Sequence, residues 1–391
     1  MAGAREGRGS VCDARREYEE AFRRLVGSAG ARAFSRGRHA LVMLLKALGV
    51  APRDRVGVCG FTCVSAVAPV KLCGAKPVYL DVDEHGCIDP EHLARRPPGS
   101  FKAVILQHTW GVPGRLDELV RQCRRIGARV VEDCALALGS SWNGAPLGSF
   151  GDGAIYSFGW GKPYTTGWGG MLTVNDESLL RSVDAHVSRW ALPERALPEL
   201  SFECQRRVWA AFVKARREVL LDLGYPDLCR WGLIGSPVEH GRDFRLRRGY
   251  VRLAGERTCR AGLREVEAWP ALMRTRRENT GRIERRLTGM GLSPWPVPRD
   301  ADVTLVAYPI LTDERARVLA AARRRYLDVI GTFDSPVYPL RGGALRTVDY
   351  TPGSCHHAER LARHLVCIPT ASTAMAHTLE HLGAIGIFPC E

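Results

Sequence analysis

Short apolar runs alternate with helical patterns of hydrophobic residues through the first half of the chain. The runs that predict strands cover residues 55–59, 78–82, 102–107, 129–132, 154–158 and 171–174. The periodic segments that predict helices cover residues 17–26, 39–48, 64–73 and 116–126, with a further helix starting near Pro90. Strands that alternate with helices in this way are typical of an α/β unit whose sheet is largely parallel.

The predicted strands are apolar along most of their length, so we expect helices to cover both faces of the sheet. In such a sheet, ligands bind outside the carboxyl ends of the strands. Asp133, Ser157 and the segment after Gln107 stand at the carboxyl ends of predicted strands. The pattern therefore predicts a ligand site at this edge of the sheet.

The pattern changes in the second half of the chain. Residues 184–245 hold three tryptophans, several prolines and a predicted helix over 208–223, and we interpret them as a variable insert or connection. A long helix is predicted over about 262–288, followed by strands over 305–311 and 337–340 and helices over 315–329 and 355–364. We predict a tail and helix (1–30), a large domain (31–245), and a connecting helix with a small α+β domain (246–391).

Composition narrows the class of protein. The 391 residues are 45% hydrophobic and 25% charged, which is ordinary for a folded chain and excludes a disordered one. No run of 18 apolar residues occurs, so we expect no membrane-spanning helix. The first ten residues are basic and lack an apolar stretch, so we expect no secretory signal. The 13 cysteines include no C-x-x-C pair, which favours reduced thiols in a cytoplasmic protein.

The net charge of +14 comes mostly from arginine, since only 6 of the 56 basic residues are lysines. The basic clusters at 274–286 and 323–325 alternate with apolar residues, as solvated helix faces do, and no aromatic platform accompanies them. We therefore expect no nucleic-acid partner, and an anionic small-molecule substrate instead. Cysteine and histidine cluster between residues 355 and 367, but their spacing matches no common zinc pattern, so we expect no metal.

Lys162 is the strongest candidate for chemistry. It lies in the sequence Gly-Trp-Gly-Lys-Pro, just beyond a predicted buried strand, in a chain that uses arginine almost everywhere else. Arginine cannot give up its proton, whereas a Schiff base needs a neutral amine. A buried carboxylate such as Asp133 would suit a pyridinium nitrogen. The alternative is a surface loop lysine and a strand-terminal cap, and the shared sheet edge favours the chemical interpretation.

These residues stand within a longer series of segments that resembles the DegT/StrS family of sugar aminotransferases, which depend on pyridoxal 5'-phosphate (PLP). The matching segments are 37–41 (GRHAL), 61–65 (FTCVS), 74–78 (GAKPV), 81–83 (DVD), 108–111 (HTWG), 131–134 (VEDC), 148–152 (GSFGD), 157–158 (SF) with Lys162, and 355–369 (CHHAERLARHLVCIP). The resemblance runs from about residue 31 to 175 and resumes near residue 262. It implies the aspartate-aminotransferase-like fold, known as fold type I.

The resemblance also implies roles for single residues. Lys162 would form the Schiff base with PLP and move the proton between substrate and cofactor carbons, and Asp133 would pair with the pyridine nitrogen. Ser157 and the turn formed by Gly37, Arg38 and His39 would hold the phosphate, where helix N-terminal amides face the anion. Arg38 stands where the family often has threonine, and a guanidinium is a competent phosphate ligand.

Several positions depart from the family's pattern. Leu136 and Leu138 replace a glutamine and a histidine that the family usually has after the aspartate. Cys63 stands where an aromatic ring often stacks on the cofactor, and Tyr250 is the nearest match for the partner subunit's phosphate-binding asparagine. Three further residues are candidate substrate contacts, namely His108, Trp110 and Trp160. Lys162 itself argues against the family's dehydratase branch, which has histidine at this position.

We therefore expect a cytoplasmic, homodimeric aminotransferase with its active site at the subunit interface. It would move an amino group from glutamate or glutamine to a nucleotide-linked keto-sugar or a keto-cyclitol, in specialised-metabolite (antibiotic) or polysaccharide biosynthesis. One alternative is a PLP enzyme that performs elimination, replacement or carbon–carbon bond formation on an amino acid. Another is a PLP-binding regulator without turnover.

Overall fold

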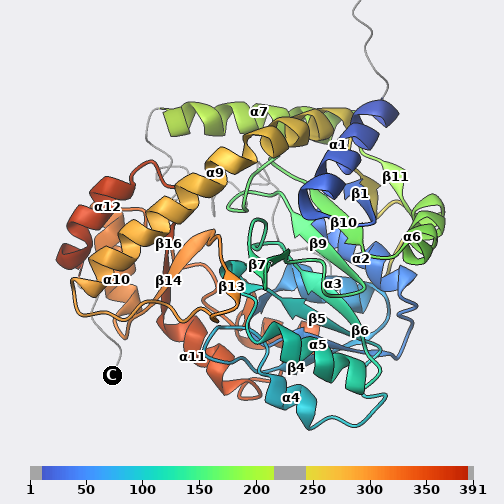
Figure 1. Ribbon diagram of the computed structural model, residues 1–391, viewed down its shortest axis with the longest axis horizontal. Coiled ribbons are helices and arrows are strands. Elements are labelled where there is room, and N and C mark those ends of the chain that lie inside the picture. The colour runs from blue at the N-terminus through green and yellow to red at the C-terminus, as the bar shows by residue number, and fades with distance from the viewer. Residues whose placement is uncertain (1–10, 215–243, 386–391) are drawn as a thin grey trace, which may run out of the picture.

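A nine-stranded sheet forms the centre of the computed structural model, which describes residues 11–214 and 244–385 (Figure 1). The strand order is β11-β12-β1-β10-β9-β6-β5-β2-β4. The strands are β1 (Gly30–Phe34), β2 (Arg55–Cys59), β4 (Lys76–Leu80), β5 (Ala103–Gln107), β6 (Arg129–Asp133), β9 (Gly153–Ser157), β10 (Gly170–Val174), β11 (Leu192–Pro193) and β12 (Arg252–Leu253). The five strands from β9 to β4 run parallel, and β10 runs against them. The predicted α/β class with a mostly parallel sheet is confirmed.

Helices cover both faces of this sheet, as the apolar strands predicted. One face packs against α2 (Gly37–Ala47), α3 (Val64–Leu72) and α6 (Glu177–Trp190). The other face packs against α1 (Val11–Val26) and α5 (Leu116–Arg125), and α4 (Pro90–Ala94) lies against α5. Successive strand residues enter different cores: Ile105 joins the α2 side, whereas Leu106 joins the α1 side. This alternation is the two-residue period of a β-strand.

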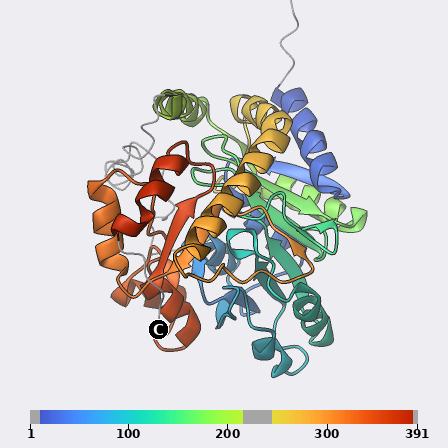
Figure 2. The same cartoon turned by 60° about the vertical axis from the view of Figure 1, so that its left-hand side comes forward.

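The second half of the chain forms a smaller group of elements beside the sheet. Its antiparallel strands are β14 (Ala307–Leu311) and β16 (Leu365–Pro369), and its helices are α10 (Arg315–Arg324), α11 (His356–His364) and α12 (Met375–His381). The long helix α9 (Glu256–Thr288) runs diagonally between this group and the sheet in both ribbon views (Figures 1 and 2). The helix α7 (Ala196–Lys214) crosses the top of the molecule and contacts α9 (Figure 1).

Short strand pairs connect these parts. β15 (Val337–Tyr338) pairs in parallel with β3 (Thr62–Cys63), and β13 (Ala301–Asp302) pairs with β7 (Ser141–Trp142). A third short strand, β8 (Ala145–Pro146), forms a hairpin with β7. The C-terminal part is therefore tied to the segments that follow β2 and β6, close to the carboxyl edge of the sheet.

Several predicted boundaries differ from the structure. The helix predicted over 315–329 ends at Arg324, because the backbone turns at Tyr326, where φ is positive. The long helix begins six residues earlier than predicted, and the strand predicted over 337–340 is only two residues long. The strand β1 and the helix α6 are additional elements. The predicted N-terminal tail and the part of the predicted helix beyond residue 214 lie outside the described residues.

No helix of the described residues is both long and apolar enough to cross a membrane.

Candidate active site

Asp133, Ser157 and Lys162 meet at the carboxyl edge of two neighbouring parallel strands. β6 ends at Asp133, which is opposite Ile155 in β9, so Ser157 at the end of β9 lies two residues further along the same edge. Lys162 follows in the loop after β9 and is half-buried. Its positive charge is one of the influences that lower the pKa of Asp133, so the two side chains are close enough to interact. The sheet edge predicted from the sequence therefore brings these three residues together.

Asp133 is a buried carboxylate, and the described groups around it only partly offset the cost of burying its charge. Burial raises its pKa above the ordinary value, and this effect outweighs the Ala135 N–H, which donates to Oδ1 at 3.0 Å, and the charge of Lys162. A buried anion of this kind gains most from a cation that binds beside it. Asp133 is therefore electrostatically suited to a positively charged ring nitrogen.

The N-terminus of α2 lies directly against the end of β9. A Cβ atom on Gly37 would lie 3.1 Å from Ser157 Cβ and 3.3 Å from Ser157 Oγ, so glycine permits this close approach. Arg36 occupies the N-cap position and makes no side-chain capping hydrogen bond. Arg38 in the first turn is buried. A helix N-terminus beside a hydroxyl and two guanidinium groups is chemically suited to an anion such as phosphate.

The loop that carries Lys162, residues 159–166, is called the lysine loop below. Contacts on both sides of Lys162 hold this loop in place. Before it, the ring of Phe158 stacks on Tyr164 with centroids 4.6 Å apart and an interplanar angle of 6°. The hydroxyl of Tyr164 lies 2.8 Å from the hydroxyl of Tyr18 in α1. The carbonyl oxygens of Lys162 and Pro163 accept hydrogen bonds from Arg276 of α9. Elements from both halves of the chain therefore set the conformation of this loop.

His39 and Tyr250 contact each other rather than the lysine loop in the described contacts. Their rings pack edge to face at 5.1 Å, and the Arg252 backbone N–H donates to His39 Nδ1 at 3.3 Å. Burial, together with the charges of Arg36 and Arg38, holds the pKa of His39 well below its ordinary range, so the ring is neutral. Both residues support the first turn of α2.

His108 is hydrogen-bonded to Glu132 in the interior of the protein. His108 Nε2 lies 2.9 Å from Glu132 Oε2, and both side chains are almost completely buried. Glu132 also accepts hydrogen bonds from the backbone N–H groups of Gly148, Phe150 and Gly151. Burial alone would raise the pKa of Glu132, but His108 and these N–H groups more than offset it, so the pKa is lowered.

Trp110 and Cys63 also have structural partners. Trp110 is 2% exposed and packs against Phe61 and Trp295. Cys63 is half-buried at the N-cap of α3, where its sulfur accepts a hydrogen bond from the Ser65 N–H, and it belongs to the short strand β3. In the structure, Trp110 therefore has a role in packing and Cys63 has a role in capping α3.

Trp160 lies in the lysine loop, two residues before Lys162, and contacts the predicted insert. Its ring is 5.0 Å from that of Trp209 in α7. Nearby, the guanidinium of Arg36 lies 4.5 Å from the centroid of Trp168 and 5.2 Å from that of Phe202, also in α7. The described part of the 184–245 segment therefore covers the loops that carry Lys162 and Gly37.

Reasoning from the sequence missed the residues that hold the site in place. Arg276 is one of 50 arginines and is separated from Lys162 by 114 positions, so no local pattern marks it. Glu132 is visible as the neighbour of Asp133, but its hydrogen-bond partners come from the loop 148–151. These roles depend on contacts between distant segments.

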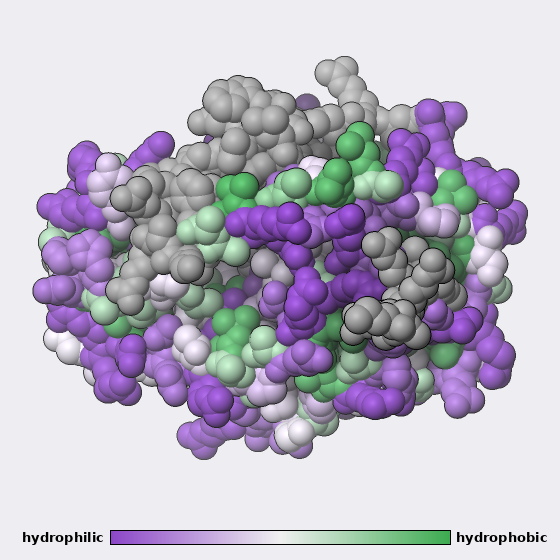
Figure 3. Space-filling view, turned by 90° about the horizontal axis from the view of Figure 1, so that it is seen from above, coloured by the Kyte–Doolittle hydropathy of each residue, from purple (hydrophilic) through white to green (hydrophobic). Residues whose placement is uncertain are grey.

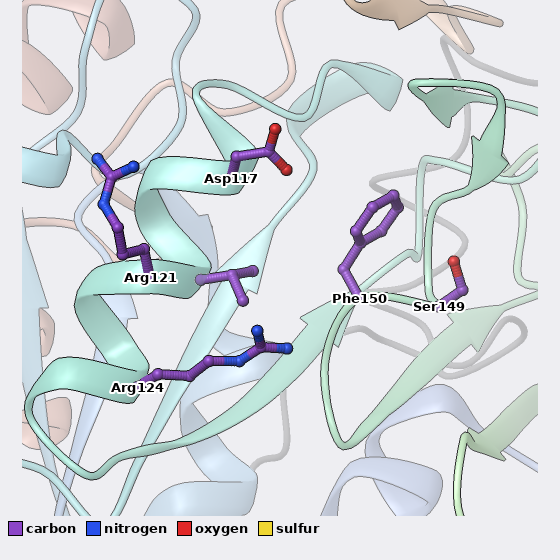
Figure 4. Close-up of a pocket in the computed structure, with 6 residues that line it drawn as sticks. Asp117, Arg121, Arg124, Ser149 and Phe150 are labelled. Atoms are coloured by element: carbon purple, nitrogen blue, oxygen red, sulfur yellow. The ribbon is translucent and has the colours of Figure 1, made fainter.

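A shallow surface depression lies elsewhere, between α5 and the loop before β9. Figure 4 shows Asp117, Arg121 and Arg124 projecting from α5, with Ser149 and Phe150 opposite. It lies beside the start of β6, where Asp152 accepts a hydrogen bond from the Val130 N–H, and it shares no residue with the predicted site. We assign no function to it.

Residues 4–188, just under half of the chain, match the model of the DegT/DnrJ/EryC1/StrS aminotransferase family, which confirms the predicted resemblance over this part of the sequence. A GDP-perosamine synthase from Caulobacter vibrioides is 37% identical over 164 residues, which is 42% of this chain and 44% of the relative. A putative L-glutamine:3-amino-2,3-dideoxy-scyllo-inosose aminotransferase from Micromonospora echinospora is 32% identical over 194 residues, 49% of this chain and 46% of the relative. The chain thus matches less than half the length of these curated relatives.

Solved structures match almost the whole chain. An aminotransferase from Psychrobacter cryohalolentis superimposes with a TM-score of 0.72 and 21% identity, covering 95% of this chain and 91% of that one. The sugar aminotransferase CalS13 from Micromonospora echinospora gives a TM-score of 0.71 and 22% identity, covering 97% and 93%. These matches confirm the predicted fold type I architecture.

Proposed function

We propose that the protein is a PLP-dependent aminotransferase that moves an amino group from glutamate or glutamine to a nucleotide-linked keto-sugar or a keto-cyclitol. The observation that carries this proposal is the juxtaposition of Lys162 with the buried Asp133 at the carboxyl edge of β6 and β9. The match of residues 4–188 to an aminotransferase family supports it. An amine and a carboxylate at one sheet edge suit PLP, because the amine can form a Schiff base and the carboxylate can keep the pyridine nitrogen protonated.

The residues present fit PLP on three counts. The carboxylate of Asp133 is buried and short of compensating charge, which suits the protonated pyridine nitrogen. The N-terminus of α2, with Ser157 beside it, suits the phosphate. Lys162 supplies a primary amine for the aldehyde. When bound, PLP supplies an electron sink that stabilises negative charge at the substrate carbon.

The chain's own groups would then divide the work of the reaction. Asp133 keeps the ring nitrogen protonated, and Ser157, Gly37 and Arg38 anchor the phosphate. Lys162 accepts the proton from the carbon of the amino donor and returns one at the opposite end of the transfer, as a positioned general base and acid does. Donor and acceptor use the same site in turn, so ping-pong kinetics are expected.

The acceptor class rests on the relatives. One is named a GDP-perosamine synthase and another a putative L-glutamine:3-amino-2,3-dideoxy-scyllo-inosose aminotransferase, and these names support a nucleotide-linked sugar or a cyclitol as the acceptor class. The basic surface of the chain, with a net charge of +14, favours an anionic acceptor such as a nucleotide-linked sugar. Biosynthesis of a specialised metabolite, such as an antibiotic, or of a polysaccharide would use such a product.

The first experiment is an absorbance spectrum of the purified protein before and after glutamate is added. We expect a visible band in the wild type that is lost in Lys162→Ala and bleaches with glutamate. Lys76→Ala is the matched control, because Lys76 is an exposed lysine on β4, and its spectrum should equal that of the wild type. A protein reconstituted with PLP that shows no Lys162-dependent band would overturn the proposal.

A second reaction type is favoured by one feature of the site. Leu136, three residues after Asp133, is apolar and half-buried, so it cannot donate a hydrogen bond to a bound ring as an amide would. Elimination, replacement or carbon–carbon bond formation on an amino acid is therefore the alternative. A visible absorbance band that stays unchanged with glutamate and glutamine but changes with another amino acid would favour this alternative over transamination.

We also propose a cytoplasmic homodimer with the active site at the interface. The helix α7 exposes Leu197, Leu200 and Val208 on the upper face of the molecule, where Figure 3 shows apolar (green) groups among polar ones. Apolar side chains gathered on one face are typical of a surface that a partner covers. α7 also packs on the loops that carry Lys162, so a partner bound there would lie beside the site.

The proposed domains are a large PLP-binding domain over residues 31–245 and a connecting helix with a small C-terminal domain over residues 246–391. The separate β14–β16 sheet supports a small C-terminal domain, whereas β12 pairs within the large sheet and so extends the large domain a few residues beyond the proposed boundary.

A further inference from the structure

Arg276 of α9 is a buried arginine whose described hydrogen bonds all go to uncharged groups. Its side chain is 5% exposed. One terminal nitrogen donates to the carbonyl of Val306 and to Thr370 Oγ1, both at 2.9 Å. The other donates to the carbonyls of Pro163 at 2.9 Å and Lys162 at 3.3 Å.

Burying a guanidinium without an anion is costly, and burial lowers the pKa of Arg276 to about 10. Among the residues that the structure describes, no carboxylate pairs with Arg276, and its Nε has no hydrogen-bond partner. A methionine or leucine would fill the same space without this cost. The position of the charge therefore points to a role beyond packing.

The carbonyl partners show what that role is. Arg276 joins three segments that are far apart in the sequence: the lysine loop, the start of β14 and the end of β16. Asn279, one turn further along α9, donates to the carbonyl of Thr370 at 2.8 Å and fixes the same junction. A planar guanidinium with several fixed donors sets the direction of each carbonyl that it binds.

We propose that Arg276 is the positioning residue for Lys162: by fixing the carbonyls of Lys162 and Pro163, it sets the direction in which the reactive amine leaves the backbone. This inference rests on the proposed function. It makes α9 the element that couples the C-terminal part of the chain to the reacting amine. Proton transfer is sensitive to such placement, because a shift of about 1 Å can cost about 100-fold in rate.

The test compares Arg276→Gln with Arg277→Gln in the full-length protein. Arg277 is the control on the same helix, because it bonds to the carbonyl of Gly139, the hydroxyl of Thr304 and the carboxylate of Asp302, but has no described contact with the lysine loop. The first readout is hydrogen–deuterium exchange of the amides of residues 159–166 in the unloaded protein. We expect faster exchange in Arg276→Gln and no change in Arg277→Gln.

The second readout is the rate at which glutamate bleaches the visible band, measured per loaded site in a single turnover. We expect about a 100-fold loss in Arg276→Gln with the KM for glutamate nearly unchanged, and a partial recovery in Arg276→Lys. Thr370→Val removes one acceptor of the guanidinium, together with the bonds of this hydroxyl to the carbonyls of Leu305 and Val306, so it serves where Arg276→Gln fails to fold, with a smaller loss expected.

Wild-type exchange in the loop of Arg276→Gln or Thr370→Val, or bleaching at the wild-type rate, would overturn the positioning role. The failure of the proposed function is a different result: the wild type itself would show no Lys162-dependent band. In that case the exchange data alone decide whether Arg276 holds the loop.

Discussion

Glu132 and Asp133 are adjacent acids with opposite electrostatic environments. Glu132 is held by His108 and by three backbone N–H groups, and its pKa is lowered despite full burial. Asp133 has one described backbone donor, and burial raises its pKa. Successive side chains of a strand point to opposite sides, so neighbours can serve different purposes. Glu132 stabilises the fold, and Asp133 is available to a ligand.

The substitution Asp133→Asn tests whether the Asp133 carboxylate serves a bound ligand. The amide keeps the size and the acceptor for the Ala135 N–H but cannot form an ion pair with a protonated ring nitrogen. We expect the protein to fold and the bleaching of the visible band by glutamate to slow about 100-fold or more. Asp152→Asn is the control, since Asp152 pairs with Arg129 at the other end of the strand. A normal rate in Asp133→Asn would contradict the assignment.

The substitution Glu132→Gln tests whether Glu132 stabilises the fold. Glutamine keeps one acceptor oxygen but loses the carboxylate charge that His108 and three backbone N–H groups face, so we expect the free energy of unfolding to fall by about 3 kcal/mol at pH 7. The pKa of Glu132 is lowered in the folded state, so its contribution is complete above its ordinary value of 4.5 and is lost as the pH falls through the folded-state value.

The difference between wild type and Glu132→Gln should therefore be the same at pH 7 and at about pH 5.5, and should shrink below pH 4.5. Urea unfolding at each pH measures it. A difference that grows on acidification would show that the lowered pKa has been assigned to the wrong group.

At the scale of elements, the approach of α2 to β9 decides whether a phosphate can be held. The contact depends on two glycines, because a Cβ on Gly170 would lie 2.4 Å from Gly37 N, and one on Gly37 would crowd Ser157. A side chain at either position would move the helix N-terminus away from the strand.

Gly37→Ala should therefore weaken PLP binding about tenfold while costing only about 1 kcal/mol of stability, because the added methyl group displaces the donors by a few tenths of an ångström. Gly343→Ala is the control, since a Cβ there meets no atom within 4 Å. Titration of each unloaded variant with PLP, followed by absorbance, measures the affinity. Equal affinities for the two variants would exclude α2 as the phosphate site.

At the scale of the whole molecule, the exposed apolar side chains of α7 bear on assembly. Leu197 is 78% exposed, Leu200 48% and Val208 52%. We expect light scattering after size exclusion to give a mass of about twice the 43.1 kDa of one chain. Leu197→Asp should shift the equilibrium towards a monomer, since a charge would then be buried in the interface. A wild-type monomer would contradict the dimer, and an unchanged Leu197→Asp dimer would place the interface elsewhere.

Local sequence patterns were enough to predict the parallel strands of the sheet and the placement of Asp133, Ser157 and Lys162 at one edge of it. Apolar runs that alternate with helical patterns predicted the parallel strands, and Asp133, Ser157 and Lys162 were placed at one edge because parallel strands share their carboxyl ends. Hydrophobic periodicity and strand direction are local properties that a chain displays in order. The strand β1 (GARAF) was not predicted, because small and charged residues make up most of it. Arg32 in this strand pairs with the distant Asp184.

Which side chains lie at the proposed site and which support it depends on how distant segments pack in the folded chain. His108 and Trp110 follow a strand end in the sequence, yet both are buried against residues of other segments. Arg276 carries no local signal, yet it fixes the carbonyl of Lys162 across 114 positions. A hydrogen bond between distant segments depends on packing that no short pattern encodes, so the residues that orient the reactive amine became visible only once the chain was folded.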